Sequence, residues 1–310
     1  MKSFLAVILA LGFFYTSPAV ADSNSGTKSY QFLKIGPVAR AAALGNAFTA
    51  VKDDPGALFY NPAGVATLKQ RGIILSYMNY VSDIQSGAVG YLHPILGHSL
   101  IGGSITYLTY GDFVQSDESG NQTGNFGVKD FSFNLTYGWS AFPFLNLGAT
   151  SKIIHEKIDD LSGYGWGLDL GAIYSLPDSR TNFGFAVQNL GAEINAIGGE
   201  KAGLPTQFKL GLTHILKGSE FLFLAEINKP VDYKFFFNFG VEISKIQPLL
   251  LRAGWSTSGS DLKFGGDSDQ WAGISFGLGA LWQELKIDYS HSFLGALGGV
   301  HRVTLSKNWE

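Results

Sequence analysis

The sequence predicts an all-β protein: a 14-stranded antiparallel transmembrane β-barrel with an N-terminal hatch, or plug, inside its lumen. Three observations predict this fold. The chain carries little charge, its apolar residues recur at every second position, and about fifty residues precede the first alternating run. Of the 310 residues, 15% are charged and 45% are apolar. A typical soluble domain is about 25% charged, so these side chains are too few to cover a large water-facing surface.

The alternation is clearest where five apolar side chains share one face of a run, with Ser, Asn, Thr and Gly between them: Phe131, Phe133, Leu135, Tyr137 and Trp139. A period of two is the period of a β-strand. Fourteen such runs lie between Gly, Pro, Asn and Asp residues, which favour turns. The predicted strands are 72–81, 85–93, 99–110, 128–140, 144–157, 164–175, 181–188, 205–215, 220–229, 234–244, 248–257, 270–282, 284–292 and 299–309.

A soluble β-sandwich also alternates, so the charge content has to separate the two folds. Runs of about ten residues are long enough to cross a bilayer at a tilt. In lipid an open sheet edge would leave backbone groups unpaired, so the sheet must close into a barrel of the outer-membrane type. Short turns alternate with longer polar loops near 111–127, 189–204 and 258–269, as expected for such a barrel.

Residues 1–21 have the features of a secretory signal peptide. Lys2 supplies the positive end, Phe4–Phe14 the apolar run and Ala19–Ala21 the small residues of the cleavage site. The alternative, a membrane anchor, needs a longer helix than eleven residues can form. We therefore expect Sec-dependent export to the bacterial outer membrane and cleavage near Ala21. The chain has no cysteine, which excludes disulfides, and its net charge of -3 gives no reason to expect nucleic acid.

Residues 22–71 form the predicted hatch and residues 72–310 the predicted barrel. Fifty structureless residues are unusual in a compact protein, and a lumen of fourteen strands is too wide for wall side chains alone to fill. Within this segment Val38–Val51 predicts a short helix after Gly36-Pro37. Asp53–Gly56 and Asn61-Pro62 predict turns.

The hatch sequence carries a resemblance to a known family. The run Ala41–Val51, followed by Asp53–Gly64, closely resembles the N-terminal signature of the PorV/PorQ family. That family is related to the FadL-type transporters of long-chain fatty acids, whose Asn-Pro-Ala hatch segment is matched here by Asn61-Pro62-Ala63.

The resemblance implies a barrel closed by its hatch, and it leaves two roles open. FadL-type relatives pass hydrophobic molecules by diffusion through a plugged barrel. PorV-type members serve the type IX secretion machinery and receive exported cargo at the outer membrane. The expected partners are therefore outer-membrane lipids together with either hydrophobic small molecules or exported cargo proteins. The sequence predicts no oligomeric state.

Two sets of residues are candidates for the functional site. The hatch set combines shaped turns with polar and apolar contacts to the wall, although the same residues could serve only to fold the plug; it is Phe48, Asp53, Asp54, Pro55, Phe59, Asn61, Pro62 and Ala63. The second set consists of charged residues on the less apolar face of their strands, which should face the lumen; it is Lys152, Asp169, Lys209, Glu226, Glu242, Arg252, Lys286 and Asp288. Most should pair with the plug or with one another, and Arg252 is the best candidate to guide a carboxylate headgroup.

An enzyme is not expected. Gly273–Gly277 fits Gly-x-Ser-x-Gly, and Asp288 and His291 follow in the order found in esterases. That motif needs a strand-to-helix elbow, whereas these residues lie within an alternating run. No cofactor is expected, and no metal site, because the histidines lack a paired metal-binding spacing.

Overall fold

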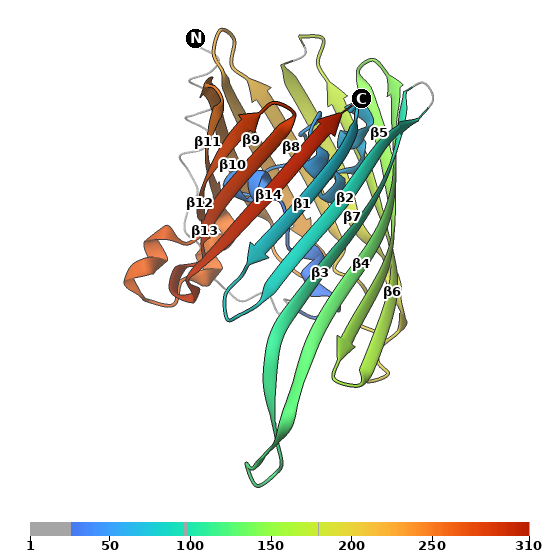
Figure 1. The fold of residues 1–310 in the computed structure, drawn as a ribbon, viewed down its shortest axis with the longest axis vertical. Coiled ribbons are helices and arrows are strands. Elements are labelled where there is room, and N and C mark those ends of the chain that lie inside the picture. Colours follow the sequence, from blue (N-terminus) through green and yellow to red (C-terminus); the bar gives the residue numbers. More distant parts are fainter. Residues whose placement is uncertain (1–25, 96–97, 179, 310) are drawn as a thin grey trace.

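The computed structural model describes residues 26–95, 98–178 and 180–309, which form a closed barrel of fourteen antiparallel strands (Figure 1). The predicted fold class is confirmed. The predicted signal peptide lies outside the described residues. Among the described residues, no helix is long and apolar enough to cross a membrane.

Each strand pairs with its neighbours in chain order, and β14 pairs with β1 to close the barrel. The strands are β1 (Arg71–Asn79), β2 (Gln85–Ile95), β3 (Ser99–Ser116), β4 (Gln122–Phe142), β5 (Leu145–Ile158), β6 (Leu161–Ser175), β7 (Thr181–Asn195), β8 (Gln207–Ile215), β9 (Phe221–Pro230), β10 (Phe236–Ile246), β11 (Leu249–Ser256), β12 (Ile274–Trp282), β13 (Leu285–Phe293) and β14 (Gly299–Trp309). Short turns connect them at the end where β14 finishes, and the two longest connections, 196–206 and 257–273, lie at the opposite end. We call these the turn side and the loop side.

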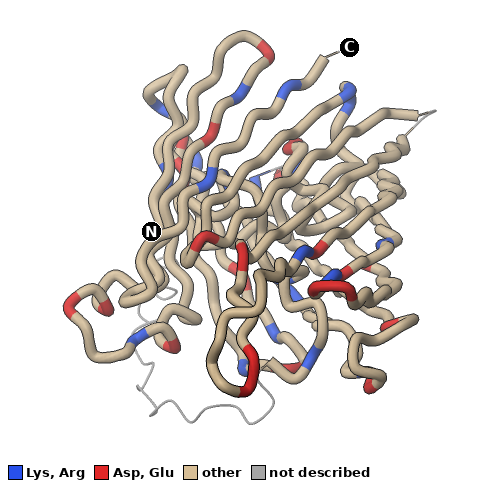
Figure 2. Tube along the Cα trace, turned by 60° about the horizontal axis from the view of Figure 1, so that its bottom comes forward, with Lys and Arg blue, Asp and Glu red and all other residues tan. Residues whose placement is uncertain are grey.

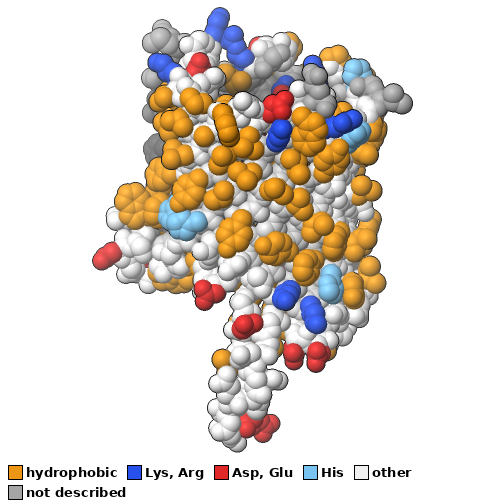
Figure 3. All heavy atoms as spheres, in the orientation of Figure 1, with side chains coloured by type: hydrophobic (Ala, Val, Ile, Leu, Met, Phe, Trp, Pro, Cys, Tyr) orange, Lys and Arg blue, Asp and Glu red, His pale blue; other side chains and the backbone are white. Residues whose placement is uncertain are grey.

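The alternating side chains divide between the two faces of the wall. In β4, Phe133 and Leu135 are 48% and 68% exposed, whereas Ser132 and Thr136 are buried. Figure 3 shows the outward apolar side chains as a broad band across the face of the barrel in view. Long stretches of the traced strands in Figure 2 carry no charged residue. An apolar outer face of this kind is stable only against hydrocarbon.

Three sequence predictions are wrong. The loop expected at 189–204 begins only after Asn195, because β7 continues to that residue. The expected loop at 111–127 is a β-hairpin, because β3 and β4 continue to pair there, with register shifts between Thr109 and Asp112 and between Gln115 and Ser116, and project well beyond the barrel rim (Figure 1). The sequence did not predict this pairing because the segment is rich in Gly and polar residues. Within the hairpin the rings of Phe113 and Phe126 stack, with centroids 5.4 Å apart. The expected helix at 38–51 shrinks to α2 (Ala39–Ala43), because Gly45 and Asn46 adopt positive φ angles and end it.

Residues 26–70, which we call the luminal segment, pack against the inner face of the wall. Besides α2 the segment contains η1 (Gln31–Lys34), η2 (Pro55–Phe59) and η3 (Pro62–Thr67). Leu44 and Phe48 pack with Ile74 and Leu224 of the wall in the main apolar cluster. The core of the protein therefore lies between the luminal segment and the wall. On the loop side, η4 (Thr257–Leu262), η5 (Asp267–Trp271) and η6 (Gly295–Leu297) form a lobe (Figure 1, lower left).

Wall glycines allow this close packing. Where the luminal segment touches the wall, strands β4 to β8 and β10 to β12 each present a glycine: Gly138, Gly148, Gly171, Gly184, Gly211, Gly240, Gly254 and Gly277. A Cβ at Gly148 would overlap the backbone of Pro62, and one at Gly184 would overlap the carbonyl of Thr49. Glycine at these positions brings the two backbones into contact.

We predict that Gly148→Ala displaces the luminal segment. The added methyl group meets backbone, which cannot rotate away, so the expected loss of unfolding free energy is about 1–3 kcal/mol. Thermal unfolding and hydrogen exchange of η3 measure the effect. Gly103→Ala is the matched control, because a Cβ there has only one neighbour within 4 Å, at 3.9 Å. Equal behaviour of the two variants would show that the close contact at Gly148 has no energetic importance.

Candidate functional site

A network of charged residues joins the luminal segment to the wall. Arg40 of α2 lies between two carboxylates. Its Nη1 is 2.6 Å from Asp54 of the same segment, and its Nη2 and Nε are 2.6 and 2.8 Å from Glu242 of β10. The two bonds to Glu242 form a bidentate pair, the strongest geometry for such an interaction.

Wall residues continue the network. Lys286 of β13 lies 3.0 Å from Asp54 and 3.4 Å from Asp288. Arg252 of β11 donates to Glu242 at 2.5 Å and to Asp288 at 2.7 Å. We call the set the charge network: Arg40, Asp54, Glu242, Arg252, Lys286 and Asp288. Three cations balance three carboxylates, which reduces the cost of placing these charges away from water.

The network controls ionisation within the luminal segment. Burial by itself would raise the pKa of Asp54, but Lys286 and Arg40 outweigh burial and hold that pKa well below its usual range. Burial would lower the pKa of Arg40, yet Glu242 and Asp54 raise it. Both groups of the segment therefore remain charged at neutral pH.

A second attachment uses Glu226 of β9. Its Oε2 accepts the backbone N–H groups of Phe48 and Thr49 at 2.9 and 2.8 Å. Lys209 of β8 lies 4.0 Å from the other carboxylate oxygen. One wall carboxylate thus holds two consecutive peptide groups of the luminal segment.

The remaining predicted lumen charges form a pair within the wall. Lys152 and Asp169 lie 2.8 Å apart, and Lys152 also donates to Asn189 at 2.7 Å. All eight charged residues that the sequence predicted to face the lumen are buried or partly buried in the structure. Arg252, the candidate for a carboxylate headgroup, has two buried carboxylate partners of its own.

The predicted turn residues shape the luminal segment. Asn61 caps η3 by accepting the N–H of Ala63 at 3.0 Å, and its Nδ2 donates to the carbonyl of Thr49 at 2.7 Å. Pro62 begins η3. The Asn-Pro-Ala turn therefore holds two separate parts of the segment together.

The other predicted hatch residues lie around η2. Asp54 caps it through the N–H of Gly56 at 2.7 Å, and Pro55 begins it. Phe59 packs between two apolar clusters. Asp53 is exposed, and its backbone N–H donates to Thr67 Oγ1 at 2.9 Å.

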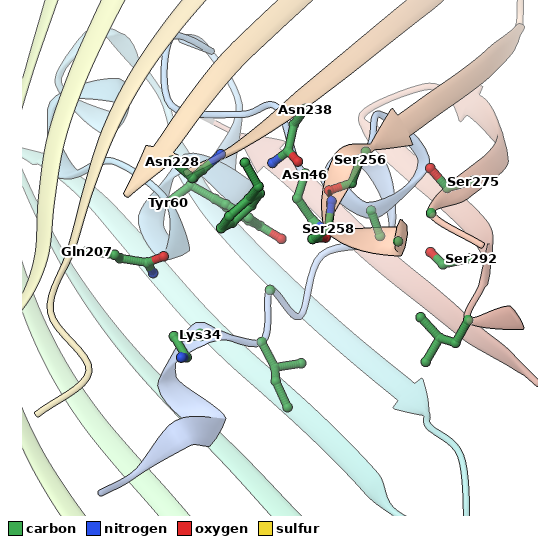
Figure 4. A pocket seen from close by; sticks show the side chains of 18 of the residues that line it. Lys34, Asn46, Tyr60, Gln207, Asn228, Asn238, Ser256, Ser258, Ser275 and Ser292 are labelled. Atoms are coloured by element: carbon green, nitrogen blue, oxygen red, sulfur yellow. Dashed lines mark hydrogen bonds between the residues drawn. The ribbon is translucent and has the colours of Figure 1, made fainter. Parts of the chain in front are cut away.

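The luminal segment separates two cavities. The loop-side cavity, of about 230 Å³, lies between the segment, the inner wall from β7 to β13 and the lobe (Figure 4). The turn-side cavity, of about 460 Å³, is lined by Arg40, Asp54 and Lys286 together with the turn at Gln283 and Glu284. The charge network therefore faces the turn side. The sequence did not reveal the loop-side cavity, because its residues come from strands far apart in the chain.

The structure does not assemble the esterase-like constellation. Ser275 and Asp288 are buried on the inner face of the wall. His291 pairs in register with Phe276, which is exposed on the outer face. The wall thus separates the histidine from the other two groups.

An apolar outer face, a closed sheet and a filled lumen define a bacterial outer-membrane β-barrel protein. Residues 19–142 match a family model described as type IX secretion system protein PorV. The resemblance seen in the N-terminal signature is thus confirmed over this part of the chain. No curated protein sequence matches the chain.

Solved structures share the fold over nearly their whole length. The toluene transporter TodX of Pseudomonas putida is 13% identical, with a TM-score of 0.61 over 86% of this chain and 96% of TodX. The toluene transporter TbuX of Ralstonia pickettii is 14% identical, with a TM-score of 0.61 over 89% and 98%. A FadL homologue of Pseudomonas aeruginosa is 12% identical, with a TM-score of 0.55 over 85% and 96%. At these identities the likeness establishes the fold.

We predict that Arg40→Gln loosens the luminal segment. Asp54 and Glu242 would each lose a buried partner, and breaking a buried ion pair costs about 3–5 kcal/mol. Hydrogen exchange of residues 39–67 measures the loss. The control is Lys234→Gln, which breaks the more exposed Lys234–Asp261 pair, whose atoms are 2.6 Å apart; a surface pair contributes at most about 1 kcal/mol. Equal exchange in both variants would contradict the assigned role of Arg40.

Acid should release the same segment. Because the folded-state pKa of Asp54 lies below its ordinary value near 3.8, its contribution is complete above that pH and is lost as pH falls through the folded value. We expect the exchange of η2, corrected for intrinsic rates, to be constant between about pH 7 and 5 and to accelerate below about pH 4. Asp54→Asn should diminish that acid step. An unchanged step would assign the transition to other carboxyl groups.

Proposed function

We propose that the protein is a passive channel for small hydrophobic solutes in the outer membrane and that the luminal segment is its hatch. The observation that carries this proposal is that one continuous segment lies between the loop-side cavity and the turn-side cavity. Displacing residues 39–67 from the wall would join those cavities. A solute moving down its concentration gradient needs no other energy source.

The attachment of the segment suits a gate. It is held to the wall by ionic and hydrogen-bonded contacts, from Arg40 to Glu242 and from residues 48–49 to Glu226. Such contacts can be exchanged for contacts with water once the segment moves. The apolar cluster around Phe48 opposes that movement, so the closed state is the resting state.

The fold supports the same class of solute. TodX and TbuX, which share this barrel over most of their length, are toluene transporters. The loop-side cavity of about 230 Å³ has room for one small molecule and is bordered by Leu33, Phe236 and Phe293. An apolar border favours solutes that leave water readily.

A second candidate function is reception of exported proteins by a type IX secretion system. The matched residues 19–142 support it, because they contain the luminal segment and the projecting β3–β4 hairpin. On that hairpin Val114 is 61% exposed and Phe113 is 42% exposed. In this role the hairpin would contact the cargo and the luminal segment would stay in place.

A disulfide lock tests the channel proposal. A Cβ built on Gly211 lies 3.3 Å from the Cβ of Ala50 and 3.0 Å from its backbone nitrogen, so a small shift of the segment brings the two Cβ atoms to the roughly 3.5–4.5 Å of a disulfide, and the chain has no native cysteine to interfere. We expect oxidised Ala50→Cys/Gly211→Cys to lose at least about nine-tenths of its toluene uptake, because uptake requires the hatch to move. Uptake is measured in vesicles with lipopolysaccharide in the outer leaflet, and a thiol reductant should restore it.

The two single-cysteine variants are the matched controls. Full uptake by the oxidised lock would exclude movement of residue 50 from the mechanism. Uptake by the unlocked protein no faster than by protein-free vesicles would reject the channel. Capture of exported proteins that is lost on shortening the hairpin at 113–126 would favour the secretion role.

A further inference from the structure

We propose that the loop-side cavity selects small uncharged amphiphiles, with a hydroxyl or amide head against its polar inner wall and an apolar body against its border. This inference rests on the proposed function, since it names the class of solute within it. The carrying observation is a group of buried polar residues that line the cavity and carry side-chain atoms without a partner among the described residues.

Two asparagines on neighbouring strands form the centre of the site. Asn228 of β9 and Asn238 of β10 are 1% and 3% exposed, and both line the cavity (Figure 4). Among the described residues, no hydrogen-bond partner lies within reach of Asn228 Nδ2 or Asn238 Oδ1. The pair thus offers a donor and an acceptor, which matches a hydroxyl or an amide.

Further unpartnered groups point to the same ligand. Asn46 Oδ1 of the luminal segment and Ser275 Oγ of β12 also line the cavity and have no partner among the described residues. Nearby, Ser256 and Ser258 bond to each other at 2.8 Å. Buried polar groups without partners are costly, and apolar side chains of the same shape would avoid that cost. Four such groups around one cavity favour a bound polar head.

The charges around the cavity exclude an ionic head. Two lysines border it, and each has a carboxylate within reach: Lys34 lies 3.1 Å from Asp232, and Lys209 lies 4.0 Å from Glu226. Arg252 does not line this cavity. With both cations paired, the site has no net charge to attract a carboxylate, and the desolvation of an ion would go uncompensated.

The border of the cavity is apolar and completes the selectivity. Its apolar side chains come from the luminal segment, the wall and the lobe, and they include Leu33, Ile35, Phe236, Leu262, Phe293 and Leu294. A single ring or short chain can contact them while its head reaches the asparagines. The expected ligand is therefore amphipathic rather than a free sugar, which would leave these apolar side chains uncovered.

Equilibrium binding to the full protein in nanodiscs of deuterated lipid tests the inference. The probes are benzyl alcohol, toluene and benzoate, which share one aromatic ring and differ in the head group. Binding is measured by ligand-observed NMR, and empty nanodiscs give the correction for partition of each probe into lipid. We expect benzyl alcohol to bind most tightly. In Asn228→Leu/Asn238→Leu its affinity should fall about 10-fold or more, as expected for two lost hydrogen bonds, while that of toluene changes less than about twofold.

Asn308→Leu is the matched control, because Asn308 also has an unpartnered Oδ1 but borders the turn-side cavity. It should leave all three affinities unchanged. Should the double variant fail to fold, Ser275→Ala removes one hydroxyl and should weaken benzyl alcohol about threefold.

The inference is overturned if toluene binds as tightly as benzyl alcohol, if benzoate binds best, or if the leucine variants bind like the unaltered protein. These outcomes would leave ordered water as the only occupant of the polar wall. Binding at equilibrium needs no passage through the hatch. Failure of the channel would therefore appear only in the vesicle uptake, and failure of this inference only in the binding series.

Discussion

Backbone hydrogen bonding in hydrocarbon is the constraint on which the rest of the structure depends. Every N–H and C=O group of the wall needs a partner, because lipid offers none. The sheet meets this requirement by pairing β14 with β1 over the full length of β1, from Arg71↔Trp309 to Asn79↔His301. Closure with fourteen strands then creates an interior too wide for wall side chains to fill. The luminal segment is the structural answer to that second problem.

Two kinds of contact place the segment, and they have different physical consequences. Wall glycines such as Gly148 and Gly254 let backbone approach backbone, which fixes the position of the segment sterically. The charge network and Glu226 supply charges and acceptors to groups that would otherwise be buried without partners. Close packing is lost within a small displacement, whereas ionic contacts persist over longer distances. The steric contacts thus fix the position of the luminal segment, and the polar contacts attach it to Glu226 and Glu242 of the wall.

The period-two pattern carried most of the information that the sequence contained. It gave the number of strands, the outward face of 131–139 and the eight lumen charges, because alternation depends only on neighbouring residues. It did not predict the hairpin at 111–127, whose strands pair in water and need no apolar face. The short α2 was missed because the helix is ended by positive φ angles at Gly45 and Asn46, which the alanine-rich run concealed.

The partners of the lumen charges were also out of reach of the sequence. Glu242 and Arg252 are register partners in one hairpin, so local reasoning could have paired them. Arg252 reaches Asp288 across β12, which requires the twist and tilt of the whole barrel. Asn228 and Asn238 line the same cavity only because β9 and β10 are neighbouring strands of the barrel. Alternation identifies the inward face, but it does not give the depth of a residue along the lumen.

The proposed binding site and the attachment of the hatch share one stretch of wall. Asn238 is the register partner of Glu226, whose carboxylate holds the backbone of residues 48 and 49. A ligand seated on the asparagines would therefore lie beside a contact that holds the luminal segment against the wall. Binding shifts the hatch only to the extent that the ligand prefers the displaced segment. A ligand with a neutral hydroxyl or amide head would favour the displaced segment if its head donates to Glu226 in place of the N–H groups of Phe48 and Thr49. A carboxylate head would instead be repelled by the carboxylate of Glu226. The negative charge of Glu226 would thus affect two properties together: which ligand heads the cavity accepts, and whether a bound ligand favours the displaced luminal segment.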